Sequence, residues 1–368
     1  MNISQISAGR DRSVALTDDG QAFGWGSVRL LGATLPPGYP GELCSSNPTE
    51  IGHNRYAQPV PQRLNHQPYA AICEGYNEFL GICSSGELVS GLPLIARETG
   101  AKQSVVPGVR PAAISVAMTE SAAFARYANG EVWSWGHVFQ GQLGRAADPG
   151  LPAEAQRPAG LPGLPACAAL VAGHGHVLAL TPEGQVWAWG ANAAGQLGLG
   201  SLTSGGAPAP LAIEARIQQV AAGDTHSLAV DDRGRLWAWG SNNWGQLGTP
   251  AVKFSSTPLR VPVGFKVARV DAGMFFSVAT STAGDAFAWG WNGLGQLGHR
   301  AALQSAQAVR IRGLTQVSQI AAGENHVLAL GRMGRQSGLW AWGDNRASAC
   351  GALPSTRCQL EPRHIPLA

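Results

Sequence analysis

The stretch Ile217–Gly248 reads IQQVAAGDTHSLAVDDRGRLWAWGSNNWGQLG and decides the fold, because near copies of it recur along the chain. One copy is Val267–Gly298, VARVDAGMFFSVATSTAGDAFAWGWNGLGQLG, and others begin at Ala169 and Val317. A fixed internal period of this length is typical of solenoids and propellers. The alanine-glycine steps of these four copies are spaced 50 residues apart, at Gly173, Gly223, Gly273 and Gly323.

Weaker copies upstream bring the number to seven. They begin at Ile3, Ala70 and Ala113, with anchors near Gly9, Gly75 and Met118.

Each copy predicts four short strands: a run with proline such as STPLRVPV, an apolar run ending in Ala-Gly, a run such as HSLAV, and a run such as RLWAWG. A glycine such as Gly234 separates the last two runs, which suits a tight hairpin because glycine accepts positive φ. Trp237 and Trp239 stand two residues apart and share one face of their strand. Apolar residues on both faces predict sheets sandwiched between other sheets, as in a propeller or a solenoid.

The two ends of the sequence favour the propeller. The chain starts inside a copy, at ISQISAG, and ends with CQLEPRHIPLA, which has the character of a first strand. We therefore expect this last segment to join the N-terminal blade and close the ring. The predicted fold is an all-β, seven-bladed propeller of four-stranded antiparallel blades, with residues 1–368 forming a single domain.

The repeated pattern AG-x-x-H, then a turn glycine, then W-A-W-G-x-N-x-x-G-Q-L-G, resembles the regulator-of-chromosome-condensation repeat family. The resemblance implies a seven-bladed propeller. Relatives include guanine-nucleotide exchange factors for small GTPases, a bacterial propeller that inhibits β-lactamases, and secreted bacterial effectors. The alanine-rich, lysine-poor composition indicates a bacterial member. The chromatin-bound relative has a basic tail, which this sequence lacks, so a chromatin role is not expected.

Residues 27–68 depart from the repeat and are rich in Pro, Gly, Asn and Tyr. We expect an irregular loop or arm between the first and second blades. It is either a cover for a degenerate blade edge or a lid that meets a partner.

Strand parity places the residues after each Ala-Gly step on the same propeller face as the WGxNxxGQLG segments. Large apolar side chains in such loops, beside charged ones, are typical of protein interfaces. Phe276 replaces the repeated histidine, so we expect it to be buried. The predicted partner-binding residues are Phe139, Trp244, Met274, Phe275, Trp291 and Leu294.

Catalytic motifs such as GxSxG, the P-loop and HExxH are absent. His176, His226 and His326 occupy one repeat position, so we interpret them as structural groups that bond local backbone. No metal site and no cofactor are expected. Weak catalytic candidates, which share one face, are His174, Asp224, Glu324, Glu78 and Glu120.

The net charge is only +3, without a basic run, so nucleic acid is not an expected partner. The N-terminus lacks a signal-peptide pattern, and no apolar stretch is long enough to span a membrane. We therefore expect a cytoplasmic monomer. Cys73 with Cys83, or Cys350 with Cys358, could form a disulfide, and the sequence leaves this open.

Three functions compete at this stage. The leading interpretation is a scaffold that binds a protein partner, as a regulator or inhibitor, through the loop face. The alternatives are an enzyme acting on a peptide or small molecule at the central opening of that face, and a guanine-nucleotide exchange factor. A purely structural assembly subunit is a further possibility.

Overall fold

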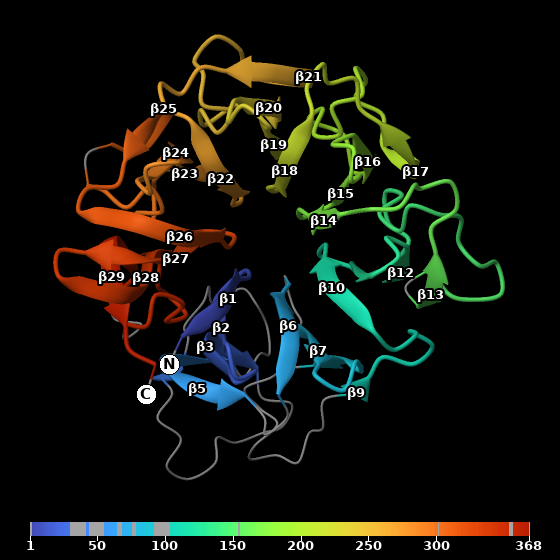
Figure 1. The fold of residues 1–368 in the computed structure, drawn as a ribbon, viewed down its shortest axis with the longest axis horizontal. Coiled ribbons are helices and arrows are strands. Elements are labelled where there is room, and N and C mark those ends of the chain that lie inside the picture. The colour runs from blue at the N-terminus through green and yellow to red at the C-terminus, as the bar shows by residue number, and fades with distance from the viewer. Residues whose placement is uncertain are drawn as a thin grey trace.

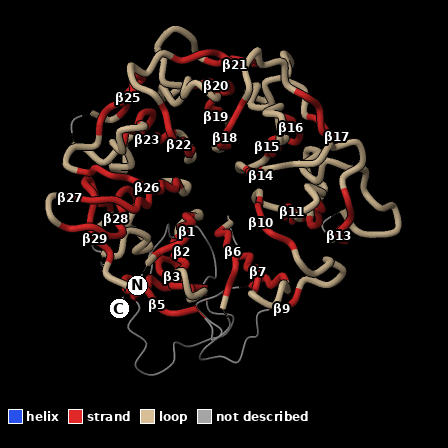
Figure 2. Tube along the Cα trace, in the orientation of Figure 1, coloured by secondary structure: helices blue, strands red, loops and turns tan. Residues whose placement is uncertain are grey.

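The computed structural model describes residues 2–29, 42–43, 55–64, 68–75, 79–91, 104–153, 155–300, 302–352 and 356–367. Within these ranges the regular structure consists of strands, and none of these residues lies in a helix. Figure 1 shows seven sheets arranged around a central axis, and Figure 2 shows the loops that join their strands. The structure confirms the all-β, seven-bladed propeller with four-stranded antiparallel blades.

The blades follow the chain in order, beginning at the N-terminus. The first three blades contain β1 (Ile3–Ala8), β2 (Arg12–Thr17), β3 (Ala22–Arg29), β5 (Arg55–Leu64) and the short β4 (Glu42–Leu43); then β6 (Tyr69–Glu74), β7 (Phe79–Cys83), β8 (Leu88–Gly91) and β9 (Ser104–Val105); then β10 (Ala113–Met118), β11 (Ala122–Tyr127), β12 (Val132–Gly136) and β13 (Gln156–Gly160).

The remaining four blades carry the clearest copies of the repeat. They contain β14 (Ala169–Ala172), β15 (His176–Leu180), β16 (Val186–Gly190) and β17 (Gly205–Pro210); β18 (Ile217–Ala222), β19 (His226–Asp231), β20 (Leu236–Ser241) and β21 (Phe254–Val261); β22 (Val267–Ala272), β23 (Phe276–Ser281), β24 (Ala286–Trp291) and β25 (Gln304–Arg310); and β26 (Leu314–Ala322), β27 (His326–Met333), β28 (Gln336–Asp344) and β29 (Cys358–Ile365).

In the fourth to seventh blades the strand that leads into the Ala-Gly step is innermost, and the fourth strand along the chain is outermost (Figure 1). In the first sheet the short β4 lies outside β5. In the fifth blade, β18, β19, β20 and β21 pair antiparallel in this order. The hairpin between β19 and β20 turns at Gly234, whose φ of 72° is one that a residue with a Cβ adopts rarely. Proline suits the outermost strand, because that strand pairs along one edge only.

The core lies between neighbouring blades. Trp239 of β20 is fully buried and belongs to the same cluster as Leu178 and Val186 of the fourth blade. Its indole Nε1–H donates to the Gln196 carbonyl of that blade at 2.8 Å. This junction is thus filled by an aromatic ring whose polar atom is satisfied by the neighbouring blade. The same arrangement recurs at Trp25, Trp189, Trp289 and Trp342.

The expected mode of ring closure is wrong. The C-terminal strand β29 pairs with β28 and completes the seventh blade, not the first. The outermost run follows the WAWG strand along the chain and pairs with its free edge, so each blade begins at its Ala-Gly strand and the chain starts at a blade boundary. The ring closes by side-by-side packing instead, where the Glu324 N–H donates to the Gly9 carbonyl at 3.0 Å.

The expectation of an irregular arm over residues 27–68 is wrong for residues 55–64. These form β5, the outer strand of the first blade, paired with β3 from Ala22↔Leu64 to Arg29↔Arg55. The strand contains Pro59 and Pro61, so it is the first blade's copy of the proline-containing outer run. Residues 30–41, 44–54 and 65–67 lie outside the described residues.

Neither candidate disulfide forms. Cys73 and Cys83 are both thiols, and so are Cys350 and Cys358. In the β6–β7 ladder Cys73 faces Leu80 and Cys83 faces Tyr69, so the two sulfur atoms are not opposite each other.

Candidate functional site

One face of the propeller carries two kinds of loop. The turns after the innermost strands lie beside the loops that join the third and fourth strands of the same blade, as the bond from Ser241 N–H to the Thr225 carbonyl (2.9 Å) shows. We call this the turn face. Strand parity therefore correctly placed the residues after each Ala-Gly step and the WGxNxxGQLG segments on one face. The WGxNxxGQLG segment, however, joins the third and fourth strands of one blade and does not lead to the next blade.

In each of the last four blades, one asparagine holds the long loop of the turn face: Asn192, Asn242, Asn292 or Asn345. Asn242 donates from Nδ2 to the carbonyls of Thr249 and Val252 at 2.7 and 2.6 Å, and its Oδ1 accepts from Leu247 N–H. The side-chain oxygen of Gln246 accepts from Trp244 N–H at 2.9 Å. These bonds explain why N and Q recur in the repeat, and they fix the position from which residue 244 projects.

Three predicted partner-binding residues form one aromatic cluster: Trp244, Phe275 and Trp291. Their ring centroids lie 6.1 Å apart between the two tryptophans and 6.4 Å from each tryptophan to Phe275. Trp244 comes from the fifth blade and the other two from the sixth, so the cluster spans a blade junction. Trp244 is 39% exposed, while Phe275 and Trp291 are half-buried.

The other predicted partner-binding residues lie apart from this cluster. Phe139 is 54% exposed and stacks on His137 in the third blade. Leu294 is half-buried in the long loop of the sixth blade, and Met274 lines the centre of the ring. Phe276 is fully buried, as expected.

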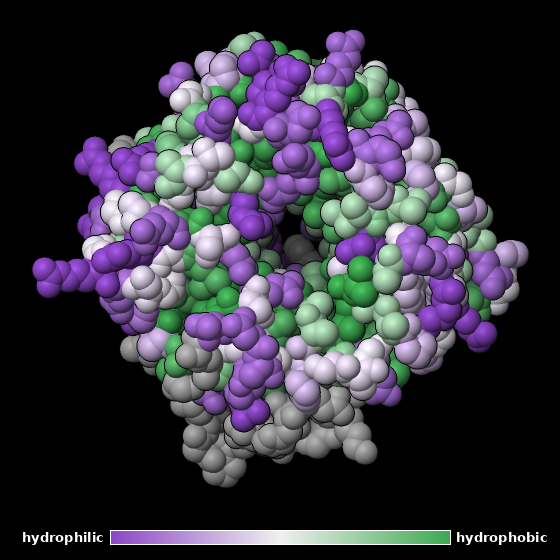
Figure 3. All heavy atoms as spheres, in the orientation of Figure 1, coloured by the Kyte–Doolittle hydropathy of each residue, from purple (hydrophilic) through white to green (hydrophobic). Residues whose placement is uncertain are grey.

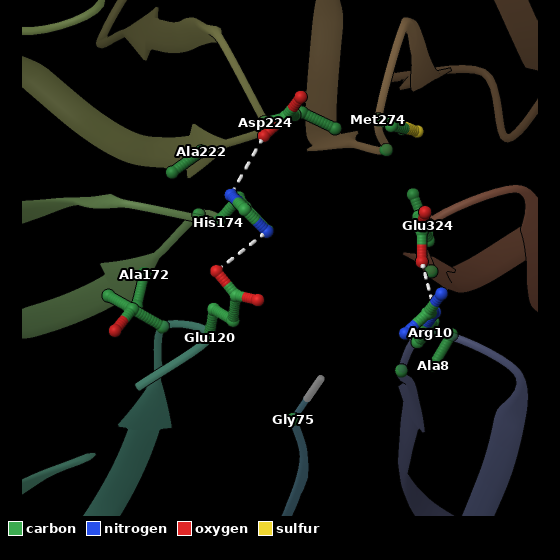
Figure 4. Close-up of a pocket in the computed structure, with 18 of the residues that line it drawn as sticks. Ala8, Arg10, Gly75, Glu120, Ala172, His174, Ala222, Asp224, Met274 and Glu324 are labelled. Carbon is green, nitrogen blue, oxygen red and sulfur yellow. Dashed lines mark ion pairs between the residues drawn. The ribbon is translucent and has the colours of Figure 1, made fainter. Parts of the chain in front are cut away.

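The turns after the innermost strands surround a central cavity of about 280 Å³. Figure 3 shows the hollow at the centre of the ring. Most of the wall is alanine and glycine, and the glycines are required there: a Cβ on Gly223 would lie 2.5 Å from the Gly273 carbonyl oxygen of the next blade. Charged side chains from several blades project around the rim of this small-residue wall (Figure 4).

On one side of the central cavity His174 lies between two carboxylates (Figure 4). Its Nε2 is 3.2 Å from Glu120 Oε2, and its Nδ1 is 3.2 Å from Asp224 Oδ1. Burial raises the pKa of Asp224; His174 lowers it, and the negative charge of Glu120 raises it. The backbone continues the chain of contacts, because Glu120 N–H donates to the His174 carbonyl at 2.9 Å.

Across the cavity, Arg10 Nε lies 3.3 Å from Glu324 Oε2 (Figure 4). Burial raises the pKa of Glu324 to about 7, Arg10 lowers it, and Asp11, Asp224 and Asp344 raise it. The structure thus brings four of the five weak catalytic candidates, His174, Asp224, Glu324 and Glu120, to one cavity. The fifth, Glu78, lies outside the described residues.

The three repeated histidines bond to the next blade and not to local backbone. His226 Nε2 lies 2.9 Å from Ser277 Oγ, and that hydroxyl donates to the Gln246 carbonyl at 2.8 Å. Because the serine proton is used on the carbonyl, the imidazole must donate from Nε2–H. Burial lowers the pKa of His226 to about 3, which keeps the ring neutral. His176–Ser227 and His326–Ser13 repeat the arrangement.

Sequence reasoning missed a buried ion pair at the junction of the first two blades. Arg12 occupies the histidine position, and its guanidinium lies 3.0 Å from Glu74 Oε2. The Glu74 side chain is 1% exposed, and burial raises its pKa to about 7 despite Arg12. The signal was available, because Arg12 stands where other copies have histidine.

The third copy is shifted by one residue from the predicted anchor. Met118 pairs with Ala123 as Ala172 pairs with Val177, so Thr119 and not Met118 occupies the glycine position. The Thr119 hydroxyl is buried and donates to Gln142 Oε1 at 2.8 Å. Among the described residues that line the cavity, Thr119 carries a hydroxyl group. This hydroxyl bonds to Gln142 and not to His174, so the pair is not arranged as a nucleophile with its base.

In the described parts of the chain, no three His, Cys, Asp or Glu side chains are grouped to hold an ion. These described residues also form no helix with the length and apolar character needed to cross a bilayer.

Comparison with known proteins places the chain in a family. A family model described as the RCC1-like domain matches residues 85–368, and a model of the regulator of chromosome condensation (RCC1) repeat matches residues 3–27. The chain belongs to the RCC1-like domain family. The resemblance read from the WAWG and GQLG segments is thereby confirmed, while the bacterial origin stays a prediction.

This RCC1-like chain is 30% identical over 221 residues to the RCC1 domain-containing protein RUG3, mitochondrial, of Arabidopsis thaliana, covering 55% of this chain and 45% of RUG3. It is 40% identical over 86 residues to human Protein RCC2, covering 23% of this chain and 16% of RCC2. The chain thus spans less than half the length of these relatives.

Two solved structures share the fold. Human WBSCR16 superposes with a TM-score of 0.77 at 23% identity, covering 94% of each chain. Yeast RCC1 (Prp20), solved with Kap60 bound, superposes with a TM-score of 0.74 at 19% identity, covering 91% of this chain and 81% of that one. At these sequence identities the structural similarity shows a shared fold and nothing more.

Proposed function

We propose that this RCC1-like propeller is a protein-binding scaffold that holds its partner on the turn face, as a regulator or inhibitor of that partner. The observation that carries the proposal is the aromatic cluster, whose three rings come from two blades and whose Trp244 is 39% exposed. Clustered tryptophan and phenylalanine on a rigid surface are typical of interface hot spots. Yeast RCC1, whose fold is similar, has been solved with the protein Kap60 bound.

The rigidity of the surface supports the same proposal. The loop that carries Trp244 is held by three hydrogen bonds of Asn242 and one of Gln246. A side chain displayed from such a loop loses little conformational entropy when a partner binds. Exchange of guanine nucleotide on a small GTPase is one special case of partner binding, and it stays a prediction.

The test is affinity capture from native lysate with mass spectrometry. We expect a protein that the wild type retains and that Trp244→Ala/Phe275→Ala/Trp291→Ala loses. The matched control is Val105→Ala/Ile114→Ala, which removes two exposed apolar side chains away from the turn face. Unfolding by circular dichroism must show that both variants fold. Equal retention by all three proteins, or retention by none, contradicts the proposal.

A second candidate function is an enzyme acting on a peptide or small molecule at the central cavity. The observation in its favour is His174, held between the carboxylates of Glu120 and Asp224 at 3.2 Å each. An imidazole in this position can accept or donate a proton. Turnover of a captured ligand that His174→Asn abolishes would support this function over simple binding.

A further inference from the structure

The central cavity carries more negative than positive charge, although the whole chain has a net charge of +3. Its lining includes the carboxylates of Glu74, Glu120, Asp224 and Glu324. Arg12 pairs with Glu74, so among the described lining residues three carboxylates remain with one guanidinium, that of Arg10. His174 adds a positive charge only when it is protonated. The cavity therefore favours a cation over an anion.

The carboxylates repel one another across the cavity. Burial is the main cause that raises the pKa of Glu324, and the negative charge of Asp224 on the opposite side raises it further. Glu120 acts on Asp224 in the same sense. A cation placed between these groups would relieve the repulsion on both sides at once.

A buried carboxylate at the wall also has unused hydrogen-bonding capacity. The Glu74 side chain is 1% exposed; its Oε2 lies 3.0 Å from the Arg12 guanidinium, whereas its Oε1 accepts no hydrogen bond from any described residue. The ion pair with Arg12 leaves the lone pairs of Oε1 without a donor. A buried oxygen left in this state is costly, and a donor entering the cavity would lower that cost.

The shape of the cavity selects among cations. Its wall is built from Ala172, Ala222, Ala272 and Ala322 together with the turn glycines, so few bulky side chains occupy the cavity of about 280 Å³. Carboxylates stand on both sides of it (Figure 4). The planar guanidinium presents donors in several directions and can bond two carboxylates at once, whereas an ammonium is a point charge.

We propose that the central cavity receives an arginine side chain of the partner protein, while the aromatic cluster holds the surface around it. This rests on the proposed function, because it names the chemistry of the partner at the same face. The arginine guanidinium lies between Asp224 and Glu324, and its aliphatic stem contacts Met274 and the alanine wall.

The test is a titration followed by NMR of the amide groups of Gly173, Gly223 and Gly323. The probe is a blocked Gly-Gly-Arg-Gly-Gly peptide, and the matched probe replaces arginine with its neutral isostere citrulline. We expect saturable shifts at the three glycines with the arginine peptide, and binding at least about tenfold weaker with citrulline. Identical titrations with the two peptides, or shifts confined to other regions, would overturn the proposal.

Variants separate this proposal from the proposed function. Asp224→Asn/Glu324→Gln should weaken the arginine peptide at least about tenfold, whereas Asp285→Asn, at the β23–β24 hairpin away from the cavity, should leave it unchanged. The Trp244→Ala/Phe275→Ala/Trp291→Ala variant should retain the glycine shifts even though it loses the partner protein. If that variant still captures the partner, the proposed function fails while the titration stands.

Two further probes decide the occupant. A lysine peptide that binds as tightly as the arginine peptide would overturn the choice of arginine. The second probe is agmatine, a free guanidinium compound. If agmatine binds more tightly than the peptide, the occupant is a small cationic ligand and not a protein side chain.

Discussion

Two neighbouring blade junctions differ in how they are packed: the one between the fifth and sixth blades, and the one between the sixth and seventh. In the first, His226 bonds to Ser277, which bonds to the Gln246 carbonyl. In the second, Phe276 takes the histidine position and Val327 the serine position, and both belong to one buried apolar cluster. The ring lies beneath a turn glycine in both, since a Cβ on Gly223 or Gly273 would lie 2.5 or 2.0 Å from it.

The difference shows that the two positions change together, across blades that are 50 residues apart in sequence. A serine opposite phenylalanine would keep only one of its bonds, and a valine opposite histidine would leave a buried N–H without an acceptor. Either mixture loses stability, because an unsatisfied buried polar group costs about 1–3 kcal/mol. The pair, not the single residue, is therefore the unit that a junction needs.

Among the junction variants, the largest effect is expected at the turn glycine, which is Gly223 in the first junction and Gly273 in the second. In Gly223→Ala the new methyl would lie 2.5 Å from the Gly273 carbonyl oxygen and 2.5 Å from His226 Cε1, neither of which can move freely. We expect a loss of about 3 kcal/mol or more in the free energy of unfolding, measured with urea. Gly206→Ala, where a Cβ meets nothing within 4 Å, is the control. Similar losses in both variants would contradict this account.

A smaller effect is expected from breaking one polar pair. Ser277→Val leaves His226 Nε2–H buried without its acceptor, so we expect a loss of about 1–3 kcal/mol. The double variant His226→Phe/Ser277→Val recreates the Phe276–Val327 arrangement and should recover much of that loss. A double-mutant cycle by urea unfolding measures the coupling. Strictly additive losses would show that the two positions are independent.

The pH dependence separates the two junctions further. The pKa values of His176 and His226 are about 3, and that of His326 is about 4, so below about pH 6.5 the unfolded chain binds protons that the folded chain does not. These groups therefore lower the free energy of unfolding as the pH is lowered. The raised pKa values of Glu74 and Glu324 act in the opposite direction between about pH 7 and pH 4.5, and that of Asp271 does so between about pH 6 and pH 3.8.

The variant His226→Phe/Ser277→Val removes one of the three histidine contributions. Between about pH 7 and about pH 5.5 it should lose about 1 kcal/mol less stability than the wild type. Urea unfolding at the two pH values measures this difference. A decline equal to that of the wild type would mean that His226 is protonated in the folded state.

The smallest effect on stability is expected on the turn face. Trp244→Ala removes a 39% exposed ring and should change the free energy of unfolding by no more than about 0.5–1 kcal/mol. Trp239→Ala in the same blade removes a fully buried ring and its bond to Gln196, and should cost about 3–5 kcal/mol. Thermal unfolding of the two variants compares them directly, and comparable losses would place Trp244 in the core.

Much of the candidate site followed from the repeat, because strand parity alone puts Trp244 and Trp291 on the face that also carries Phe275. The grouping of His174, Asp224, Glu324 and Glu120 on one face followed in the same way. What parity could not give was the distance between blades. The aromatic cluster closes across one junction, whereas Phe139 belongs to another blade and stacks on His137.

The sequence by itself determined the repeat, the seven blades and the antiparallel order of strands. These features depend on the alternation of apolar residues, the turn glycines and the WAWG runs, which direct the backbone within a few residues along the chain. Only the tertiary structure decided which partner each edge takes. It gave β29 to the seventh blade, made residues 55–64 a strand, and placed Ser277 against His226. These are contacts between segments far apart in the chain, and they depend on how neighbouring blades pack around the ring.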